Sequence, residues 1–212
     1  MSVSQVNRSS WAYRLCNVRY DYGDGSVLEI DELVVPQGQS TCLLGPTGAG
    51  KSTLLRLLAR SIEPTSGHVE MAGDTLGPNR RPSVAMVYQH PIPLRRTVFE
   101  NIAYGLRVRS LSRQDIQANV DRWLEVLQLT DLAGQRADRL SGGQWTLVAL
   151  GRALVTEPDV LLLDEPTANL DPARVELVER VVAEEQRRRP CTVVWSTHHL
   201  FQARRVADQV AL

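Results

Sequence analysis

Apolar and polar residues alternate along the first part of the chain, and this pattern predicts β-strands. YRLCNVRYDY (13–22) and VLEIDELVV (27–35) follow a period of two and are separated by the turn-forming GDGS, so we expect two strands joined by a turn. STCLL (40–44) predicts a short buried strand, which the glycine-rich GPTGAG ends. Apolar residues then recur at helical spacing in KSTLLRLLARSI (51–62), which predicts a helix. Two further strands are expected in HVEMAG (68–73) and SVAMVYQ (83–89).

Helical spacing replaces alternation between residues 91 and 140. TVFENIAYGLRVR (97–109) and SRQDIQANVDRWLEVLQL (112–129) both predict helices, and Ser112 with Asp115 fits a capping box at the start of the second. These residues therefore predict a helical lobe of about fifty residues, inserted into the rest of the chain.

Strand and helix patterns alternate through the last third of the chain. Helices are expected from about Ser141, from Pro172 and from His198, and the strands VLLLD (160–164) and TVVWS (192–196) lie between them. Because such alternation favours parallel sheets covered by helices, we predict an α/β fold with a mainly parallel sheet.

The length, composition and charge of the chain limit the class of protein to which it can belong. The chain has 212 residues, of which 43% are hydrophobic, and this is enough for one large domain with a sizeable core. Its 24 basic and 24 acidic residues give a formal net charge of zero, which argues against a dedicated nucleic-acid binder. The run Arg187–Arg189 ends a predicted helix, where positive charge is favourable.

The cysteines and the hydropathy both favour a cytosolic chain. Cys16, Cys42 and Cys191 are odd in number and form no CxxC pair, so we expect reduced thiols. No apolar stretch approaches the ~18 residues of a membrane span. MSVSQVNRSS (1–10) lacks the apolar core of a signal peptide. Any membrane association is therefore expected to run through a partner.

GPTGAGKST (45–53) matches G-x-x-x-x-G-K-[ST], the pattern of a phosphate-binding loop. Its glycines permit backbone conformations that a β-carbon would block, and the turn aims N–H groups at an anion beside a helix N-terminus. Lys51, which is the only lysine among 24 Lys and Arg residues, can reach the β- and γ-phosphates, and Ser52 can ligate Mg²⁺. The expected nucleotide-binding residues are Gly45, Pro46, Thr47, Gly48, Ala49, Gly50, Lys51, Ser52 and Thr53.

LSGGQ (140–144) predicts a second anion site. Ser141 and Gln144 alone fit a capping box, but a cap does not need Gly142 and Gly143, which each cost about 1 kcal/mol inside a helix. Two glycines at a helix start indicate that a ligand approaches the backbone closely. An anion is the expected ligand, because a helix N-terminus offers free N–H groups.

VLLLDEPTANLD (160–171) ends a predicted strand with two acids. Asp164 and Glu165 follow the apolar run directly, at the carboxyl end of a parallel strand, where ligands bind in open α/β sheets. Asp164 suits the outer shell of a Mg²⁺ ion, and Glu165 suits polarising an attacking water.

With these motifs in this order, the chain resembles the ATP-binding subunit of an ABC transporter over nearly all of its length. The resemblance implies a single P-loop NTPase domain over residues 1–212. Within it, residues 1–90 and 141–212 would form a RecA-like core with an N-terminal antiparallel β subdomain, and residues 91–140 an inserted helical subdomain. The resemblance also implies ATP and Mg²⁺ as ligands and ATP hydrolysis as the activity.

The resemblance adds further site residues. Gln89 looks like the Q-loop glutamine that senses Mg²⁺ and links to the helical lobe, and Asp171 looks like the D-loop aspartate. His198 looks like the switch histidine that contacts the γ-phosphate. Tyr22 looks like the aromatic on which adenine stacks, and Tyr20, on the same face by period two, is the competing choice.

The family works as a dimer, which defines the expected partners. Each of two ATP molecules lies between the phosphate loop of one subunit and the LSGGQ of the other, so Ser141–Gly143 would serve the partner's ATP. The helical lobe passes the movement to membrane permease subunits, and a solute-binding protein is an indirect partner. We therefore expect a cytoplasmic protein on the inner face of the cell membrane, with no nucleic acid partner.

Two stretches indicate the direction and class of transport. QHPIPLRRTVFENIAYGLRVR (89–109) resembles the importer pattern, and THHLFQARRVAD (197–208) resembles subunits that serve uptake of tungstate, molybdate or phosphate. Three features depart from the family: Trp145-Thr146-Leu147 after LSGGQ, His199 after the switch histidine, and an end at VADQVAL where the family usually continues. Two other functions stay open, a soluble ATPase acting on ribosomes or DNA and an ATP-binding assembly switch with weak hydrolysis.

Overall fold

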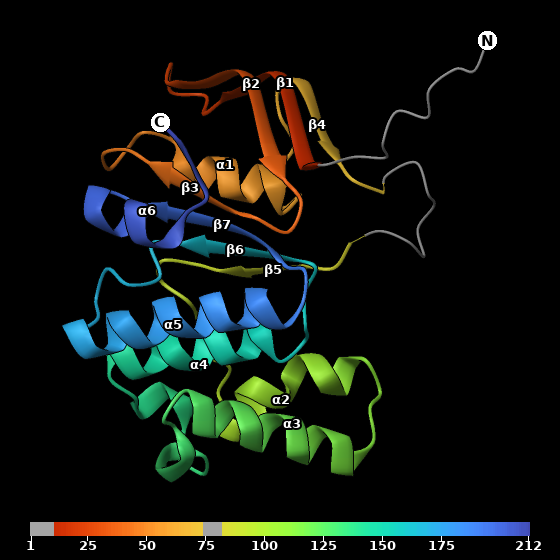
Figure 1. Cartoon of the computed structure of the whole chain (residues 1–212), viewed down its shortest axis with the longest axis vertical. Coiled ribbons are helices and arrows are strands. Elements are labelled where there is room, and N and C mark those ends of the chain that lie inside the picture. The colour runs from red at the N-terminus through yellow and green to blue at the C-terminus, as the bar shows by residue number, and fades with distance from the viewer. Residues whose placement is uncertain (1–10, 74–81) are drawn as a thin grey trace.

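The computed structural model describes residues 11–73 and 82–212, and Figure 1 shows them as stacked layers. From top to bottom of the view come an antiparallel sheet, a helix, a parallel sheet, a pair of helices and a helical segment. The expectation for MSVSQVNRSS lies outside the described residues.

Three strands form the antiparallel sheet. β1 (Trp11–Asp21), β2 (Val27–Pro36) and β4 (Ser66–Met71) pair in the order β2-β1-β4, which confirms the prediction from alternation. Tyr13 and Leu15 on β1 are fully buried, because successive side chains of a strand point to opposite faces and one face covers the core.

Five strands form the second sheet, and this confirms the mainly parallel sheet that the sequence predicts. Each pairing between them is parallel. In spatial order the strands are β5 (Val84–Val87), β6 (Val160–Asp164), β7 (Thr192–Thr197), β3 (Ser40–Leu44) and β8 (Gln209–Ala211). β8 has no counterpart among the expected strands, because three residues at a sheet edge carry too little pattern.

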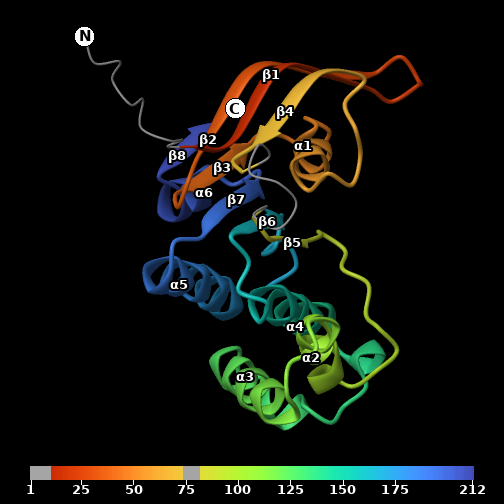
Figure 2. The ribbon, with the colours of Figure 1, turned by 90° about the vertical axis from the view of Figure 1, so that its right-hand side faces the viewer.

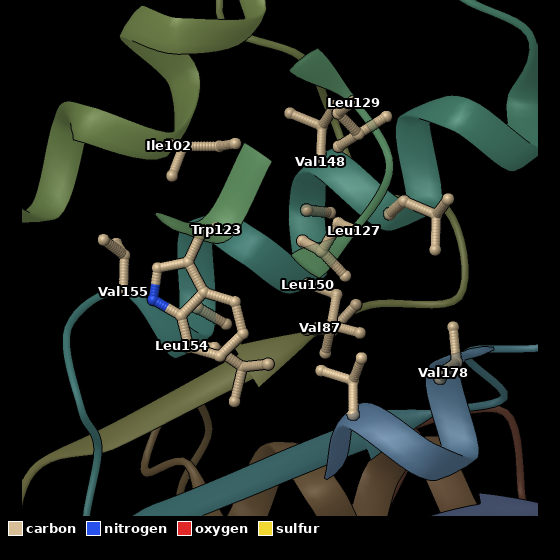
Figure 3. Close-up of a cluster of buried hydrophobic side chains, with 14 of the residues drawn as sticks. Val87, Ile102, Trp123, Leu127, Leu129, Val148, Leu150, Leu154, Val155 and Val178 are labelled. Atoms are coloured by element: carbon tan, nitrogen blue, oxygen red, sulfur yellow. The ribbon is translucent and has the colours of Figure 1, made fainter. Parts of the chain in front are cut away.

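The parallel sheet buries a separate set of side chains on each face. Leu161 and Leu163 pack in one cluster with helices α4 (Gly142–Leu154) and α5 (Pro172–Arg188), and Figure 3 shows part of this cluster. Leu162 packs on the opposite face with α1 (Lys51–Leu58) and the antiparallel sheet. Helix α1 therefore lies between the two sheets (Figure 2), with Lys51 as its first residue.

The segment between β5 and α4 is helical. It holds α2 (Val98–Val108), α3 (Arg113–Val126) and the short 3₁₀ helices η3 (Thr130–Leu132) and η4 (Ala137–Arg139). Helix α2 packs against both α3 and α4. Ser112 caps α3, since its hydroxyl accepts the Asp115 N–H at 3.1 Å, but the Asp115 carboxylate accepts from the Ser112 hydroxyl and does not complete the predicted capping box. Within residues 11–73 and 82–212, no helix is long and apolar enough to cross a bilayer.

Three helix boundaries differ from the sequence-based expectation. Helix α3 ends at Val126 and not at 129, and Gln128 after it takes a left-handed backbone with φ of 57°. Helix α1 ends at Leu58 and not at 62, because Arg60 takes a left-handed backbone with φ of 55°. Helix α6 (Leu200–Val206) begins two residues after His198, since His199 is the extended residue that precedes the first turn. His198 therefore lies in the loop between β7 and α6.

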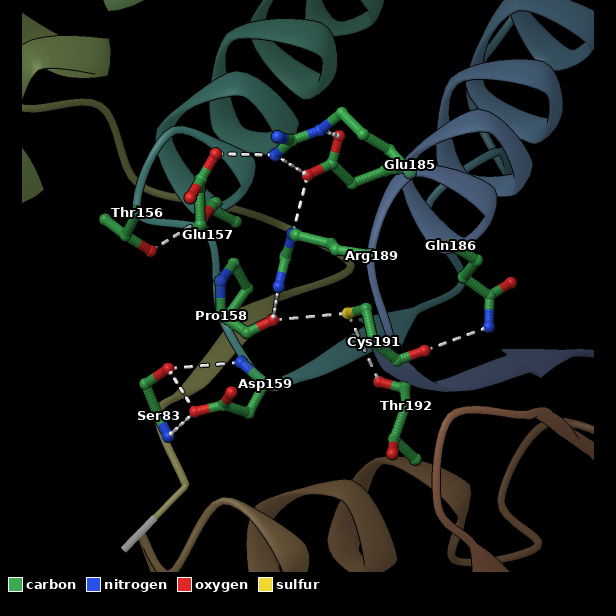
Figure 4. A network of polar contacts seen from close by, with 12 residues as sticks. Ser83, Thr156, Glu157, Pro158, Asp159, Glu185, Gln186, Arg189, Cys191 and Thr192 are labelled. Carbon is green, nitrogen blue, oxygen red and sulfur yellow. Dashed lines mark hydrogen bonds and ion pairs between the residues drawn. The ribbon is translucent and has the colours of Figure 1, made fainter. Parts of the chain in front are cut away.

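A polar network closes the C-terminal end of α5 (Figure 4). Glu185, which is 4% exposed, accepts hydrogen bonds from Arg188 and Arg189, each at 2.7 Å. Arg189 also donates to the carbonyl of Pro158 at 2.7 Å. The arginine run ends the helix as predicted, and it also neutralises a buried acid of the same helix.

The ion pairs at Glu185 predict a pH-dependent contribution to stability. Burial raises the pKa of Glu185, but the hydrogen bonds from Arg188 and Arg189 outweigh it and hold the pKa below the ordinary 4.5. Glu185→Gln is therefore expected to lower the free energy of unfolding by about 1–3 kcal/mol at neutral pH.

Because the folded-state pKa is lowered, this contribution is present above about pH 4.5 and is lost as the pH falls through the lowered pKa. Urea titrations of both proteins at pH 7 and pH 4 measure the difference. A difference of the same size at both values would contradict the assignment.

Candidate functional site

The loop between β3 and α1 has the backbone of an anion-binding turn. Gly48 and Gly50 have φ of 87° and 85°, in the left-handed region that residues with a β-carbon avoid. A β-carbon on Gly45 would lie 3.3 Å from that of Ala49. Gly50 precedes the first turn of α1, so the free N–H groups of the helix N-terminus begin at the loop.

A cavity of about 570 Å³ opens at this loop. Its walls come from the turn after β1, the start of β2, the phosphate loop with the start of α1, and the residues that follow β5 and β6. The lining residues are Tyr22, Ser26, Val27, Leu28, Thr47, Gly48, Ala49, Gly50, Lys51, Ser52, Thr53, Gln89 and Glu165. Residues that are far apart in the sequence therefore share one surface.

The ammonium group of Lys51 is enclosed by three acceptors. Its Nζ lies 2.8 Å from the carbonyl of Gly45, 2.9 Å from that of Pro46 and 3.4 Å from Oε1 of Glu165. The side chain is 9% exposed, so these acceptors match the three donors of an ammonium at a buried position. Burial raises the pKa of the nearby Cys42 thiol to about 11, although Lys51 opposes the shift, so Cys42 is a neutral core residue as expected.

Asp164 ends β6 as a buried hydrogen-bond acceptor. It is 3% exposed, and its Oδ1 accepts from the hydroxyl of Ser52 at 3.0 Å and from that of Ser196 at 2.8 Å. Asp164 and Ser196 are register partners on neighbouring parallel strands, so the carboxyl edge of the sheet brings them together. No sequence motif singles out Ser196, whose proximity to Asp164 follows from the register of β6 and β7.

Glu165 lies between Lys51 and His198. Its Oε2 is 3.2 Å from Nδ1 of His198, and its N–H donates to the hydroxyl of Ser196 at 2.9 Å. Its backbone has a φ of 42°, a conformation that costs a non-glycine residue roughly 1–3 kcal/mol. The fold holds this strained residue with its carboxylate at the cavity.

The donor set beside Lys51 fits Mg²⁺. The Ser52 hydroxyl and the Asp164 carboxylate are 3.0 Å apart, and Gln89 lines the same cavity as Ser52. Mg²⁺ prefers oxygen ligands and keeps several waters, so one or two protein groups beside phosphate oxygens suffice. Among the described residues no group of three or more His, Cys, Asp and Glu forms an all-protein metal cage.

The two candidate tyrosines occupy different positions. Tyr22 lines the cavity and donates to the hydroxyl of Thr53 at 2.6 Å. Tyr20 packs on the hydrophobic core and meets Tyr22 edge to face, with ring centroids 5.1 Å apart. Tyr22 is therefore the better placed of the two to contact a bound base.

The LSGGQ motif forms the start of α4 and is not part of the cavity lining. Ser141 and Gln144 make the predicted capping box: the Ser141 hydroxyl accepts the Gln144 N–H at 3.3 Å, and the Ser141 N–H bonds back to Gln144 at 3.0 Å. A β-carbon on Gly143 would come within 3.0 Å of Arg174, whereas one on Gly142 would meet open space. The Arg174 side chain therefore crowds the α-carbon of Gly143, whereas that of Gly142 faces open space.

Asp171 also lies outside the cavity lining. It caps α5, because its Oδ1 accepts the Arg174 N–H at 3.0 Å, and its Oδ2 is 3.2 Å from the Arg174 guanidinium. The structure thus gathers the phosphate loop, Gln89, Asp164, Glu165 and His198, but keeps Ser141–Gln144 and Asp171 apart from them.

A buried glutamine, which no sequence motif singles out, supports the loop that holds His198. Gln202 on α6 is 4% exposed and accepts from the hydroxyl of Thr197 at 2.8 Å. It donates to Thr167 at 2.8 Å and to Glu179 at 3.0 Å. Through Gln202, Thr197, the residue before His198, is therefore hydrogen-bonded to Thr167 in the loop that follows Glu165.

The chain is similar to known ATP-binding proteins along most of its length. It is 38% identical over 194 residues to the tungstate uptake system ATP-binding protein TupC of Peptoclostridium acidaminophilum, covering 92% of this chain and 90% of that protein. It is 35% identical over 227 residues to the phosphate import ATP-binding protein PstB 2 of Aliivibrio fischeri, covering 100% and 83%.

Its fold is similar to solved structures as well. The structure of cbiO1 from Clostridium perfringens, part of the ABC transporter complex cbiONQ, superposes with a TM-score of 0.80 at 28% identity, covering 95% of this chain and 84% of that one. The family model described as ABC transporter matches residues 28–168, which include the phosphate loop, LSGGQ and the acid pair. The chain belongs to the ABC transporter family.

Proposed function

We propose that this chain is the ATP-hydrolysing subunit of an importer and works as a homodimer with membrane permease subunits. The observation that carries the proposal is the convergence of Lys51, Glu165 and His198 at the carboxyl edge of the parallel sheet. Relatives that match over most of the chain and are named as import or uptake ATP-binding proteins support it.

The phosphates of ATP bind at the loop through its N–H groups and Lys51. Phosphate oxygens compete with Gly45, Pro46 and Glu165 for the Lys51 ammonium. As Lys51 turns to the phosphates, the Glu165 carboxylate is released beside His198 and can accept a proton from the attacking water. His198 would contact the γ-phosphate from the same side.

Ser52, Asp164 and Gln89 would hold Mg²⁺ next to the phosphates. When bound, the ion neutralises phosphate charge during hydrolysis. Ser196 keeps Asp164 oriented, because its hydroxyl donates to the same oxygen that Ser52 contacts.

A second copy of the chain would complete each site. Ser141–Gly143 and Asp171 lie outside the cavity of their own chain, and α4 offers free N–H groups next to the open Gly142. We assign the γ-phosphate of the partner's ATP to this helix start. Two ATP molecules would then bridge two chains, and hydrolysis would separate them.

The permease would dock on the helical segment and the strand end before it. Ile92 and Val108 are 80% and 69% exposed, and Tyr88 and Tyr104 are 42% and 45% exposed. A second cavity, of about 370 Å³, is lined by Tyr88, Ile92 and Arg152 and reaches Gln89 and Asp164 beside the ATP site. A membrane subunit seated here would sense the nucleotide through Gln89. We propose that the chain binds peripherally, in this way, to the cytoplasmic face of the membrane.

The transported solute is proposed to be an oxyanion. The relatives include proteins named for tungstate uptake, phosphate import and sulfate/thiosulfate import. The membrane and solute-binding partners make the choice among such anions.

Substituting Ile92 tests the permease surface. Co-expression with permease subunits encoded beside the gene should give a complex that co-purifies, and Ile92→Asp should abolish it by burying a charge at the interface. Phe201→Asp on α6, at a residue that is 75% exposed, is the matched control and should leave the complex intact. Equal recovery of both variants in the complex would contradict this docking surface.

Substituting the two tyrosines tests the base contact. Tyr22→Ala is expected to raise the KM for ATP roughly tenfold, in line with the stacking of a base on an aromatic ring. Tyr20→Ala should affect the thermal midpoint more than the KM, because its ring packs on the core. Steady-state ATPase assays and thermal melts of both variants separate the two effects, and the reverse pattern would make Tyr20 the stacking residue.

A further inference from the structure

Trp145 follows the LSGGQ motif, and its position explains a departure from the family pattern. It lies in the first turn of α4, is 7% exposed and belongs to the core cluster under the parallel sheet. Its indole Nε1–H donates to the carbonyl of Pro91, which comes two residues after Gln89. The signature helix is therefore bonded directly to the segment that leaves the ATP cavity.

Arg152 adds a second attachment from the same helix. It lies seven residues after Trp145, on the same helical face. Its guanidinium donates to the carbonyl of Ile92 at 3.3 Å and lies 5.3 Å from the centroid of the Trp145 ring. Within about 6 Å of an aromatic face a cation is attracted to the ring, so the two side chains support each other.

The C-terminal end of the same segment, residues 94–97, is hydrogen-bonded to α2. Asn101 is fully buried, accepts the Leu94 N–H at 3.0 Å and donates to the carbonyls of Leu94 and Thr97 at 3.1 and 2.9 Å. Residues 89–97 thus run from the ATP cavity to two helices, held by α4 near Gln89 and by α2 further along.

We propose that Trp145 is a positioning residue that fixes the 89–92 segment to the signature helix, so that Gln89 and Ser141–Gly143 move as one unit. The consequence is that binding at the phosphate loop of one chain, sensed by Gln89, is transmitted within that chain to the helix start that serves the partner's ATP. This consequence rests on the function proposed above, whereas the attachment itself does not.

Two substitutions separate the hydrogen bond from the packing of the ring. Trp145→Phe keeps an aromatic ring but removes the donor. Trp145→Gln removes the ring but keeps an N–H donor three bonds from Cβ, as in the indole. Trp123→Phe is the matched control, because Trp123 is 2% exposed in the same cluster but lies on α3, which packs against α2.

Hydrogen exchange followed by mass spectrometry tests the attachment without nucleotide. Peptides that cover residues 89–96 report on the amides of Leu94 and Arg96, which are hydrogen-bonded within the folded chain. Trp145→Phe should speed their exchange roughly fivefold, the effect of one lost hydrogen bond, and Trp145→Gln, which keeps the donor, should speed it less. Exchange in Trp145→Phe no faster than in Trp123→Phe would overturn the proposal.

A second pair of readouts tests positioning. Trp145→Phe should lower kcat and raise the Mg²⁺ concentration at half-maximal rate, whereas Trp145→Gln, which keeps the donor, should change both less. Faster exchange without either kinetic change would overturn the positioning role.

If Trp145→Phe does not fold, Arg152→Met, which keeps the aliphatic stem, must speed exchange in the same peptides, and unchanged exchange there would also overturn the proposal. Absent hydrolysis by the wild type would instead refute the proposed function, while the exchange result still decides the attachment.

Discussion

Glu165→Gln is expected to bind ATP, lose hydrolysis by at least ~100-fold, as for removal of a general base, and accumulate as a closed dimer. The carboxylate lies 3.2 Å from Nδ1 of His198 and 3.4 Å from Nζ of Lys51, and the Ser196 hydroxyl, which accepts the Glu165 N–H, holds the backbone there. An amide keeps the size of the side chain but cannot take a proton from water. The dimer persists because the step that opens it is blocked.

Sedimentation velocity with and without Mg-ATP measures the dimer, and phosphate release measures hydrolysis. Glu157→Gln is the matched control, because Glu157 also has a left-handed backbone, with φ of 48°, but pairs with Arg188 on the surface. Rapid ATP turnover by Glu165→Gln would refute the role of Glu165. Negligible hydrolysis by the wild type, together with ATP-dependent assembly, would favour the assembly switch over the transport ATPase.

Lys51→Arg is expected to abolish hydrolysis, with a loss of about 100-fold or more, comparable to the removal of one transition-state donor. The three acceptors around Nζ suit a compact ammonium, whereas a planar guanidinium is broader and directs its donors in a fork. Arg56→Lys, the reverse change on the exposed face of α1, is the control and should have little effect on the rate. Comparable rates for the two variants would show that Lys51 does not contact the phosphates.

The sequence predicts the layers of this fold because strand and helix periods are strong signals over long runs. Leu161 and Leu162 illustrate this, since a buried strand of apolar residues serves two clusters on opposite faces. β8 could not be predicted because it is a short strand that forms only by pairing at a sheet edge. The early end of α1 could not be predicted because it depends on the backbone conformation of one residue, Arg60.

In the candidate site, too, some residues are predictable from the sequence and others are not. The phosphate loop and the acid pair are predictable because their chemistry requires particular residues at fixed spacing. Ser196 and Gln202 act through register and burial, and serines and glutamines are common at positions without such roles. The crowding of Gly143 could not be predicted from the sequence either, because Arg174, which lies against it, comes from another helix.

The lone lysine offers the most direct test of the central claim, that this loop binds the phosphates of ATP. Lysine labelled with ¹³C at the ε-carbon alone gives one side-chain signal in this chain, because Lys51 is the only lysine. Titration with ATP or ADP in the presence of Mg²⁺ should shift the Lys51 ε-carbon signal to saturation, and AMP, which lacks the β- and γ-phosphates, should leave it in place. A signal that does not move at saturating ATP, or that AMP moves as far, would contradict the assignment of this site.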